Sequence, residues 1–435
     1  MSKKNIKRNR SDLSDWIIHF VHDRSRDQRP EWIINPSGYG FGENGDEDVD
    51  EHLMAIEWSL ENMNFDIEES DKLSAFEVLK LILAMGYIRA GFSYRNENKT
   101  IYGNRPAICF TEMPLHALIQ YSKNRSQLNL TSSYAIAFPR TELFQYGARN
   151  VIYGLTGSHQ EADQEDLYYD VWHRNLAESC GLGLHEQYRY VYTNLKADKS
   201  IDWTHEREWR LACDYGNHSK VGLNFLLKEE ENNPIKKFSQ IVVIVNTEDE
   251  SEILLNHLAQ YYHGDLFEYS TEIVERIKII SFEYLSTLPD VDFSNISIDN
   301  IDYRDFKKHN KKESTEQEQK EVIGFLEEAI AFADKRHEEE WDNWQKKGLY
   351  LAENGDYFDG CAFVNIVLDE PTKKYSNALI DIEYAQPNGS WGILLRKVRG
   401  PATQSSTIKR FYCENIIKKL TELTGEKFSI HEYAD

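Results

Sequence analysis

The sequence predicts an α+β protein of two domains, and three observations support this expectation. The chain has 435 residues, more than a single hydrophobic core usually serves. Its apolar fraction of 40% and aromatic fraction of 12% are enough to fill packed interiors. Short strand patterns are interleaved irregularly with helix patterns, which favours mixed sheets over a regular doubly wound fold. We therefore expect a mixed-sheet N-terminal domain over 1–288, a linker over 289–317, and a smaller α+β domain over 318–435.

The strand and helix patterns of the N-terminal domain are short. Trp16–Val21 is β-branched and aromatic and is bounded by polar residues, which predicts a buried strand. Apolar residues recur every three to four positions over Leu73–Met85, which predicts a helix with Ser70 as N-cap and Gly86 as its stop. Pro114 suits the first turn of another helix. Further strands are expected at 107–110, 134–138, 150–154, 209–213, 240–245 and 276–284, and further helices at 141–146, 166–180 and 251–262.

Two stretches of the N-terminal domain are predicted to be surface loop. Asn35–Gly42 is rich in glycine and turn residues, and five of the six residues in Asp46–Glu51 are acidic. A glycine-rich phosphate loop requires a preceding strand and a following helix N-terminus, but an acidic run follows here. The sequence therefore favours an acidic insertion over a phosphate cradle.

The C-terminal domain follows a polar linker. A charged helix is expected at 318–347, strands at 362–368, 378–384 and 391–398, and a closing helix at 407–423. Its basic cluster comprises Arg396, Lys397 and Arg399. We interpret this cluster as a solvated strand end rather than as a nucleic-acid contact.

The net charge excludes several classes of function. The chain carries 50 basic and 73 acidic residues, a net charge of −23. Of these, 19 basic and 23 acidic residues lie from residue 307 onward, which leaves 31 and 50, or −19, in the first 306. A field of that sign repels phosphate backbones. The sequence therefore disfavours nucleic acid as a partner of the N-terminal domain and leaves a protein, a nucleotide or a small acceptor.

The patterns of apolar residues and cysteines predict a cytoplasmic protein. No apolar run is longer than about five residues, far below what a membrane span requires. The basic residues of 1–10 are not followed by the apolar run of a secretory signal. The five cysteines lie far apart with no Cys-x-x-Cys pair, which argues against a disulfide framework and a structural zinc site. We expect no membrane anchor and no metal site.

The most informative local string runs from Trp203 to Leu211. On an ideal strand, Glu206, Glu208 and Arg210 point to one face. A carboxylate there can orient a ribose hydroxyl or stabilise an oxocarbenium ion, and the arginine can fix it in place. The alternative is a charge ladder or a buried Glu–Arg pair. Spacing alone favours that structural alternative.

Two other strings place polar groups beside predicted strands. Thr111 and Glu112 stand between a strand and a helix, where polar side chains either face a ligand or cap the helix. His19 lies within an apolar strand, and a single histidine in such a place is more often a core residue than a functional one.

Read in order, these strings resemble the AbiGi group of abortive-infection proteins. The resemblance rests on His19-Phe20, on 109–115 (CFTEMPL), on 134–138 with 146–153, and on 206–210 (EREWR). It spans roughly 19–284, and the acidic insertion departs from the expected spacing. AbiGi proteins are bacterial antiphage factors, described as one half of a toxin and antitoxin pair and often labelled the antitoxin. The resemblance therefore implies a role in phage defence.

The layout is also similar, in pattern order alone, to ADP-ribosyltransferases such as DarT. That resemblance implies an ADP-ribosyltransferase-like fold with NAD as substrate. It implies that His19 contacts the adenylate and ribose side of NAD, that Phe110 and Thr111 lie against nicotinamide, and that Glu208 drives the transfer. Glu206 or Arg210 would support Glu208.

Two functions therefore follow from the sequence. The first is antiphage defence by transfer of ADP-ribose from NAD to a cellular or phage target. The second is a non-enzymatic antitoxin or phage sensor that binds a protein partner, a phage trigger or a cognate toxin or antitoxin, through an acidic surface. Self-association of the C-terminal domain also suits either function.

Overall fold

The chain folds into two compact units. The computed structural model divides it into residues 1–251 with 272–305 and residues 252–271 with 306–435. The stretches 35–42 and 46–51, most of the helix expected after Pro114, and most of the linker expected at 289–317 lie outside the described residues. The structure describes residues 14–25, 72–92, 94–95, 98–115, 117, 134–155, 161–166, 171–196, 199–213, 222–226, 237–263, 271–288, 301, 303–305, 313–347, 362–387, 392–401, 403 and 405–434.

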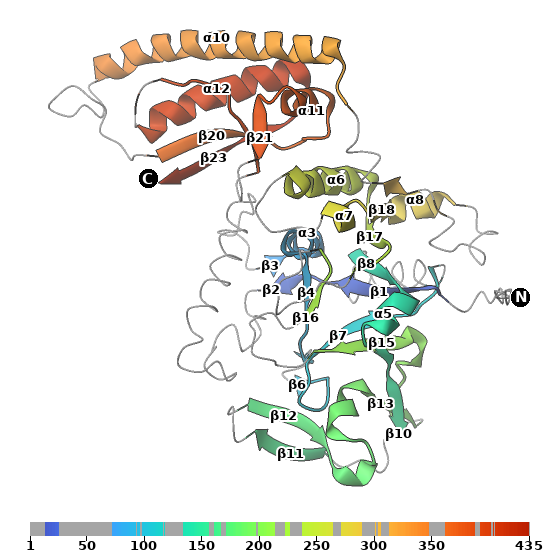
Figure 1. Cartoon of the computed structure of the whole chain (residues 1–435). Helices are drawn as coiled ribbons and strands as arrows, with labels where there is room; N and C mark the ends of the chain where they lie inside the picture. Colours follow the sequence, from blue (N-terminus) through green and yellow to red (C-terminus); the bar gives the residue numbers. More distant parts are fainter. Residues whose placement is uncertain are drawn as a thin grey trace, which may run out of the picture. The chain divides into compact units, whose positions relative to one another are not determined.

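The N-terminal unit is built on an eight-stranded sheet with the order β19-β18-β17-β8-β1-β7-β15-β9 (Figure 1). Neighbouring strands are antiparallel except β17 and β18, so the sheet is mixed and the α+β class is confirmed. The strands are β1 (Trp16–Val21), β7 (Ala107–Thr111), β8 (Tyr134–Pro139), β9 (Arg149–Asn150), β15 (Glu208–Ala212), β17 (Ile241–Val245), β18 (Ile277–Ser281) and β19 (Arg304–Asp305).

Smaller elements surround this sheet. The helices of the unit include α3 (Ala75–Met85), α5 (Arg140–Gln145), α7 (Thr271–Val274) and α8 (Phe282–Thr287), and α6 (Glu248–His263) runs across the boundary between the units. The short 3-10 helices are η3 (Glu178–Cys180), η4 (Leu184–Arg189) and η5 (Thr204–Glu206). The further strands are β2 (Arg24–Ser25), β3 (Lys72–Leu73), β4 (Tyr87–Arg89), β5 (Tyr94–Arg95), β6 (Asn98–Lys99), β10 (Ile152–Leu155), β11 (Glu161–Asp166), β12 (Val171–Leu176), β13 (Tyr190–Lys196), β14 (Lys199–Ile201) and β16 (Gly222–Asn224).

Helix α3 begins two residues later than the sequence predicts, and its N-cap lies one turn later. Its N-cap is Ser74 rather than Ser70, because Ser74 forms a capping box with Glu77: each side chain accepts a hydrogen bond from the other residue's backbone N–H. The helix ends as predicted at Gly86, whose left-handed backbone (φ 63°) glycine adopts at little cost.

The helix predicted over 166–180 is wrong. Residues 161–166 and 171–176 form the antiparallel pair β11 and β12, followed by the short 3-10 helix η3. Val171 and Trp172 favour strands, and pairing with β11 satisfies backbone groups that a helix would have satisfied internally. The hairpin therefore outweighs the helical spacing of the apolar residues.

The C-terminal unit has the chain order of a split β-α-β fold. Its sheet, β21-β22-β20-β23, is antiparallel throughout, and the connectivity β-α-β-β-α-β with that strand order is ferredoxin-like. The strand predicted over 378–384 is wrong, since residues 378–381 end α11 and 382–384 form the turn that follows it. The elements are α10 (Glu316–Lys347), β20 (Ala362–Leu368), α11 (Lys374–Asp381), β21 (Ala385–Pro387), β22 (Ile393–Leu395), α12 (Ser406–Thr424) and β23 (Phe428–Ala434).

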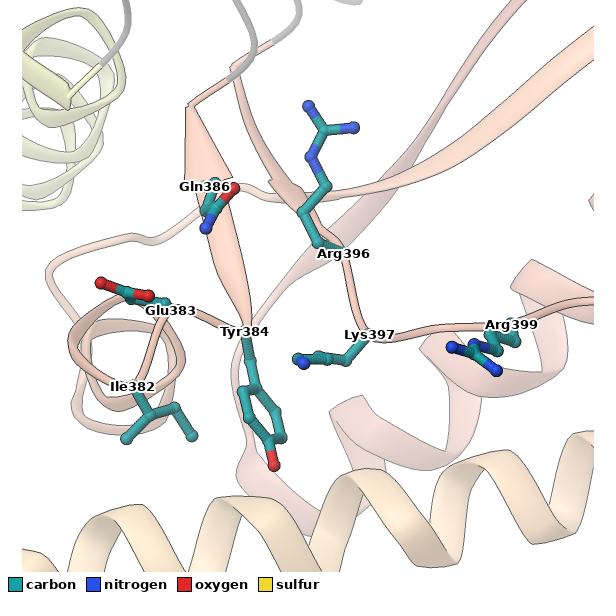
Figure 2. A pocket seen from close by; sticks show the side chains of 7 residues that line it. All are labelled: Ile382, Glu383, Tyr384, Gln386, Arg396, Lys397 and Arg399. Carbon is teal, nitrogen blue, oxygen red and sulfur yellow. The ribbon is translucent and has the colours of Figure 1, made fainter.

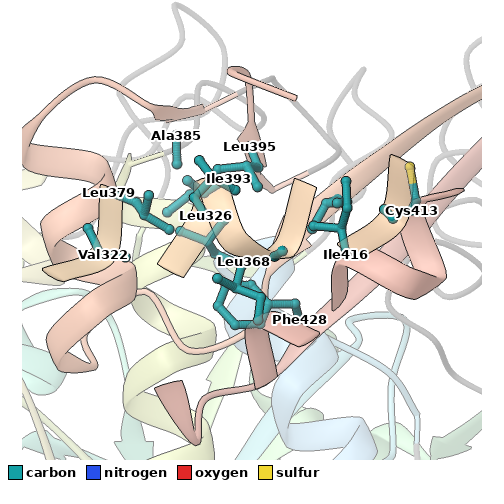
Figure 3. Close-up of a cluster of buried hydrophobic side chains, with 14 of the residues drawn as sticks. Val322, Leu326, Leu368, Leu379, Ala385, Ile393, Leu395, Cys413, Ile416 and Phe428 are labelled. Atoms are coloured by element: carbon teal, nitrogen blue, oxygen red, sulfur yellow. The ribbon is translucent and has the colours of Figure 1, made fainter. Parts of the chain in front are cut away.

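One face of this sheet carries the core of the C-terminal unit (Figure 3). Alternate residues of β20, such as Ile366 and Leu368, point to that face and pack against α10 and α12. Helix α10 presents Val322, Leu326, Ala329 and Ala333 at helical spacing, and all four are buried. Of the helices that the structure describes, none is long and apolar enough to cross a membrane.

Candidate functional site

Strands β1, β7 and β15 lie side by side and bring the predicted site residues into one region. In the register of the sheet, Thr111 stands opposite Glu208 on one side and opposite Ile18 on the other. Arg210 stands opposite Cys109. Residues that are about 90 to 100 positions apart in the sequence therefore become neighbours.

The same register divides the predicted residues between two faces of the sheet. Thr111, Glu208 and Arg210 share one face because opposite residues in antiparallel strands point the same way. His19 and Phe110 lie on the other face, with their rings 5.7 Å apart in an edge-to-face arrangement. The structure thus forms two groups of predicted residues instead of a single cluster.

Glu208 and Arg210 form a buried ion pair on the first face. Arg210 Nε lies 2.7 Å from Glu208 Oε1, and the two side chains are only 6% and 12% exposed, respectively. Arg210 Nη1 also donates to the backbone oxygens of Tyr188, at 2.5 Å, and Tyr190, at 3.3 Å. Burial works against the charged guanidinium, but the nearby Glu208 carboxylate leaves the pKa of Arg210 raised. The pair fixes the Glu208 carboxylate in one position.

Glu206 does not share the strand with Glu208, contrary to the sequence expectation. Strand β15 begins at Glu208, while Glu206 ends the 3-10 helix η5. The chain turns between them at Arg207, which has the left-handed φ of 47° that residues other than glycine seldom adopt. The turn brings Glu206 to the rim of the site and breaks the alternation on which the sequence prediction depended.

Thr111 holds this turn in place. Its hydroxyl donates a short hydrogen bond to the backbone oxygen of Glu206 and accepts one from the N–H of Met113 at 3.1 Å. Thr111 itself is only 5% exposed. The hydroxyl proton is therefore used inside the protein, and Thr111 positions η5 relative to β7.

His19 bonds to the backbone of the neighbouring strand. Its Nδ1 lies 2.9 Å from the backbone oxygen of Cys109, and a carbonyl oxygen can only accept, so Nδ1 carries a proton. In the neutral ring, Nε2 is then the acceptor nitrogen. His19 is half-buried, whereas Phe110 beside it is only 3% exposed and packs on Phe138. His19 therefore links β1 to β7.

Cys109 and Tyr153 complete the surroundings of Glu208 and were not predicted as site residues. Burial, and then the Glu208 carboxylate, raise the pKa of the Cys109 thiol to about 12. The Tyr153 hydroxyl accepts from the Glu208 N–H at 3.1 Å and donates to the Trp203 oxygen at 3.3 Å, and burial raises its pKa. Both are protonated at neutral pH.

Glu112 belongs to a second buried network, on the other side of the strand end. Its Oε1 lies 2.6 Å from Arg140 Nη1, and its Oε2 accepts from Trp209 Nε1 at 2.9 Å. Arg207 approaches the same carboxylate at 3.8 Å. Sequence spacing gives no signal for this network, because its members come from three separate segments. Glu112 therefore joins β7, α5 and β15.

The described side chains offer limited means of holding a ligand at this site. Within the part of the chain that the structure describes, no group of three or more His, Cys, Asp or Glu residues has the arrangement of a metal site. Of the predicted site residues, His19 and Glu206 are partly exposed, Glu208 is 12% exposed, and Phe110, Thr111 and Arg210 are buried. A dinucleotide substrate would meet carboxylates on one face and the histidine on the other.

Comparison with known proteins finds no family model, no curated protein and no solved structure that matches this chain.

Proposed function

We propose that the N-terminal unit is an antiphage-defence enzyme that transfers ADP-ribose from NAD, with Glu208 as the catalytic carboxylate. The observation that carries this proposal is the placement of Glu208. It follows the left-handed residue Arg207, stands opposite Thr111, and is fixed by Arg210 at 2.7 Å. The resemblance of the local strings to AbiGi proteins supports the defence role.

The chemistry requires a fixed negative charge. Breaking the bond between nicotinamide and ribose builds positive charge on the ribose ring, and a preorganised carboxylate stabilises that charge. Glu208 supplies the carboxylate, and Arg210 limits its movement without contacting the substrate. Glu206, partly exposed at the end of η5, would accept a hydrogen bond from the acceptor or from a ribose hydroxyl.

In this proposal His19 and Phe110 are positioning residues. His19 fixes Cys109 through the backbone oxygen, and Cys109 stands opposite Arg210. The implied contact of His19 with the adenylate side of NAD requires the substrate to pass around the ends of the strands, because His19 and Glu208 lie on opposite faces of the sheet.

A matched pair of variants tests the proposal. Glu208→Gln keeps the shape of the side chain, and we expect it to abolish the transfer of label from adenylate-labelled NAD to protein and nucleic acid of a bacterial lysate. Glu206→Gln serves as the control, which we expect to retain part of the transfer. Circular dichroism of both variants checks that they fold. Equal labelling by Glu208→Gln and the wild-type protein would contradict the proposal.

The second function is a non-enzymatic antitoxin or phage sensor, and one observation favours it. Glu208 and Arg210 neutralise one another while both are buried, as a purely structural pair would. In that case the acidic N-terminal unit binds a protein partner, and cells protected by the protein remain protected with Glu208→Gln. Loss of protection with that variant would contradict the second function.

A further inference from the structure

The C-terminal unit contains a cleft lined by basic side chains, and none of its lining residues belongs to the proposed active site. The cleft has a volume of about 400 Å³ and is formed where α11 ends and where the chain leaves β22 (Figure 2). Its charged and polar lining comprises Glu383, Tyr384, Gln386, Arg396, Lys397 and Arg399. A volume of this size falls in the range of small-molecule sites.

The hairpin of β21 and β22 sets the spacing of this lining. Ala385 pairs with Leu395, and the Arg396 N–H donates to the Tyr384 oxygen at 2.8 Å. The two strands therefore place Tyr384 and Arg396 opposite one another at the end of the hairpin. In Figure 2, Glu383, Tyr384 and Gln386 lie on one side of the cleft and the three basic residues on the other.

Lys397 and Arg399 of the cleft differ from several other cationic residues of the same unit in their ion pairing. Lys374, Arg410 and Lys419 each lie within 3.4 Å of a carboxylate oxygen. Among the described residues, no carboxylate forms such a pair with Lys397 or Arg399, and both are exposed. Lys397 Nζ lies 5.4 Å from the centre of the Tyr384 ring. Exposed cations such as Lys397 and Arg399, which pair with no carboxylate among the described residues, favour the binding of an anion.

Glu383 gives the cleft a further recognition group. It occupies the left-handed position (φ 59°) after α11, where its N–H donates to the Ile380 oxygen and the Tyr384 N–H donates to the Leu379 oxygen. This hydrogen-bond pattern is that of a Schellman motif, in which the position is usually glycine. The glutamate adopts it at a cost in stability, and its carboxylate is exposed at the cleft.

We propose that this cleft binds a free nucleotide. The phosphates would lie against Arg396, Lys397 and Arg399, since guanidinium groups bind phosphate oxygens in pairs. The Tyr384 ring offers an aromatic surface for the base, and the Gln386 amide can donate and accept hydrogen bonds. The Glu383 carboxylate would repel a bare phosphate but accepts hydrogen bonds from ribose hydroxyls, which favours a nucleotide over an inorganic anion.

Calorimetric titration of the full chain tests this proposal, with ATP, pyrophosphate, adenosine and a short single-stranded RNA as probes. We expect ATP to bind more tightly than adenosine and than pyrophosphate. The triple variant Arg396→Gln, Lys397→Gln, Arg399→Gln should weaken ATP binding at least about tenfold. Glu383→Gln should weaken the binding of ATP more than that of pyrophosphate.

A control triple variant removes the same charge elsewhere in the unit. Lys335→Gln, Arg336→Gln and Arg410→Gln change exposed side chains of α10 and α12, and we expect ATP affinity to stay within about twofold. Equal loss in both triple variants, or adenosine binding as tightly as ATP, would overturn the proposal. Binding of the RNA more tightly than ATP would overturn the assignment to a free nucleotide. Because the test does not involve Glu208, its outcome is independent of the NAD chemistry proposed above.

Discussion

The charged residues of the two units are used in different ways. In the N-terminal unit, Glu208 and Arg210 are buried and neutralise one another at 2.7 Å. In the C-terminal unit, Arg396, Lys397 and Arg399 are exposed and line a cleft. Burial makes the first cluster costly to alter and fixes its geometry, whereas exposure leaves the second cluster available to an anion. The difference shows that location in the fold, more than local charge, decides what such clusters do.

The largest expected effect is the loss of Arg210. Arg210→Met leaves Glu208 buried without its partner, so the N-terminal unit should lose about 3–5 kcal/mol of stability. Arg396→Met, the matched change in the exposed cluster, should stay within about 0.5 kcal/mol. Hydrogen–deuterium exchange of the β15 and β22 amides measures each unit separately. Similar losses from the two variants would show that the clusters do not differ in this way.

The reactivity of the Cys109 thiol, beside Glu208 and Arg210, is a second test of how well this cluster is shielded from solvent. With a pKa of about 12, Cys109 has a thiolate fraction near pH 8 about a thousandfold below that of a thiol at the ordinary value of 9.0. Alkylation of the native protein by iodoacetamide, followed by peptide mass spectrometry, should modify the half-buried Cys180 long before Cys109. Equal rates at the two cysteines would mean that the region around Glu208 opens readily to solvent.

The C-terminal unit contains a buried carboxylate that pairs with no cation among the residues that the structure describes. Glu426, only 5% exposed, accepts from the N–H groups of Tyr375 and Ser376, both at 2.7 Å, at the start of α11. Glu426→Ala leaves both donors buried and unbonded, and it should cost about 2 kcal/mol. Urea denaturation of the variant measures this loss. An unchanged midpoint would show that water replaces the carboxylate.

The contribution of Glu426 to the stability of the fold should decrease as the pH rises. Burial raises the pKa of Glu426 above its ordinary value of 4.5, so the folded state binds the proton more tightly than the unfolded chain. The resulting stability is fully present below pH 4.5 and is lost as the pH rises through the folded pKa. Glu426→Gln, which cannot titrate, should show a shallower fall in stability over this range, as followed by urea denaturation. An identical pH profile for variant and wild type would contradict the raised pKa.

The smallest expected effect lies at the end of α11. Glu383→Gly relieves the left-handed backbone at φ 59°, but glycine also gives the unfolded chain more freedom, so the net stabilisation should be about 0.5–1 kcal/mol. The melting temperature measures it. In the same variant we expect weaker ATP binding. A more stable variant that binds ATP less tightly would separate the role of the carboxylate in recognition from the destabilisation that its backbone conformation causes. A destabilised variant would show that the side chain supports the fold.

The elements predicted best from the sequence are those whose residues alone determine them. Trp16–Val21 forms β1 at the predicted bounds, because its β-branched and aromatic residues suit a buried strand. The expected strand over 362–368 is likewise found as β20. By contrast, the strand over residues 171–176 depends on pairing with β11 as well as on its own residues, and this pairing has no local signature. The spacing of residues within a short segment does not reveal which distant segment pairs with it.

The same reasoning applies to the candidate site. The pairing of Glu208 with Arg210 could be foreseen, because residues two apart on a strand share a face. The displacement of Glu206 could not, since it depends on the left-handed turn at Arg207. Nor could the network of Glu112, whose partner Trp209 is 97 residues away. Turns with unusual backbone angles and long-range pairs therefore limited the prediction.

The release of nicotinamide from NAD tests the central claim most directly. The wild-type protein and the cleft triple variant Arg396→Gln, Lys397→Gln, Arg399→Gln should both release it, because the cleft takes no part in the proposed chemistry. Glu208→Gln should release none, since it lacks the carboxylate that stabilises the ribose cation. Chromatography of the reaction mixture measures nicotinamide in all three. Release by Glu208→Gln at the wild-type rate, or no release by the wild-type protein, would contradict the account.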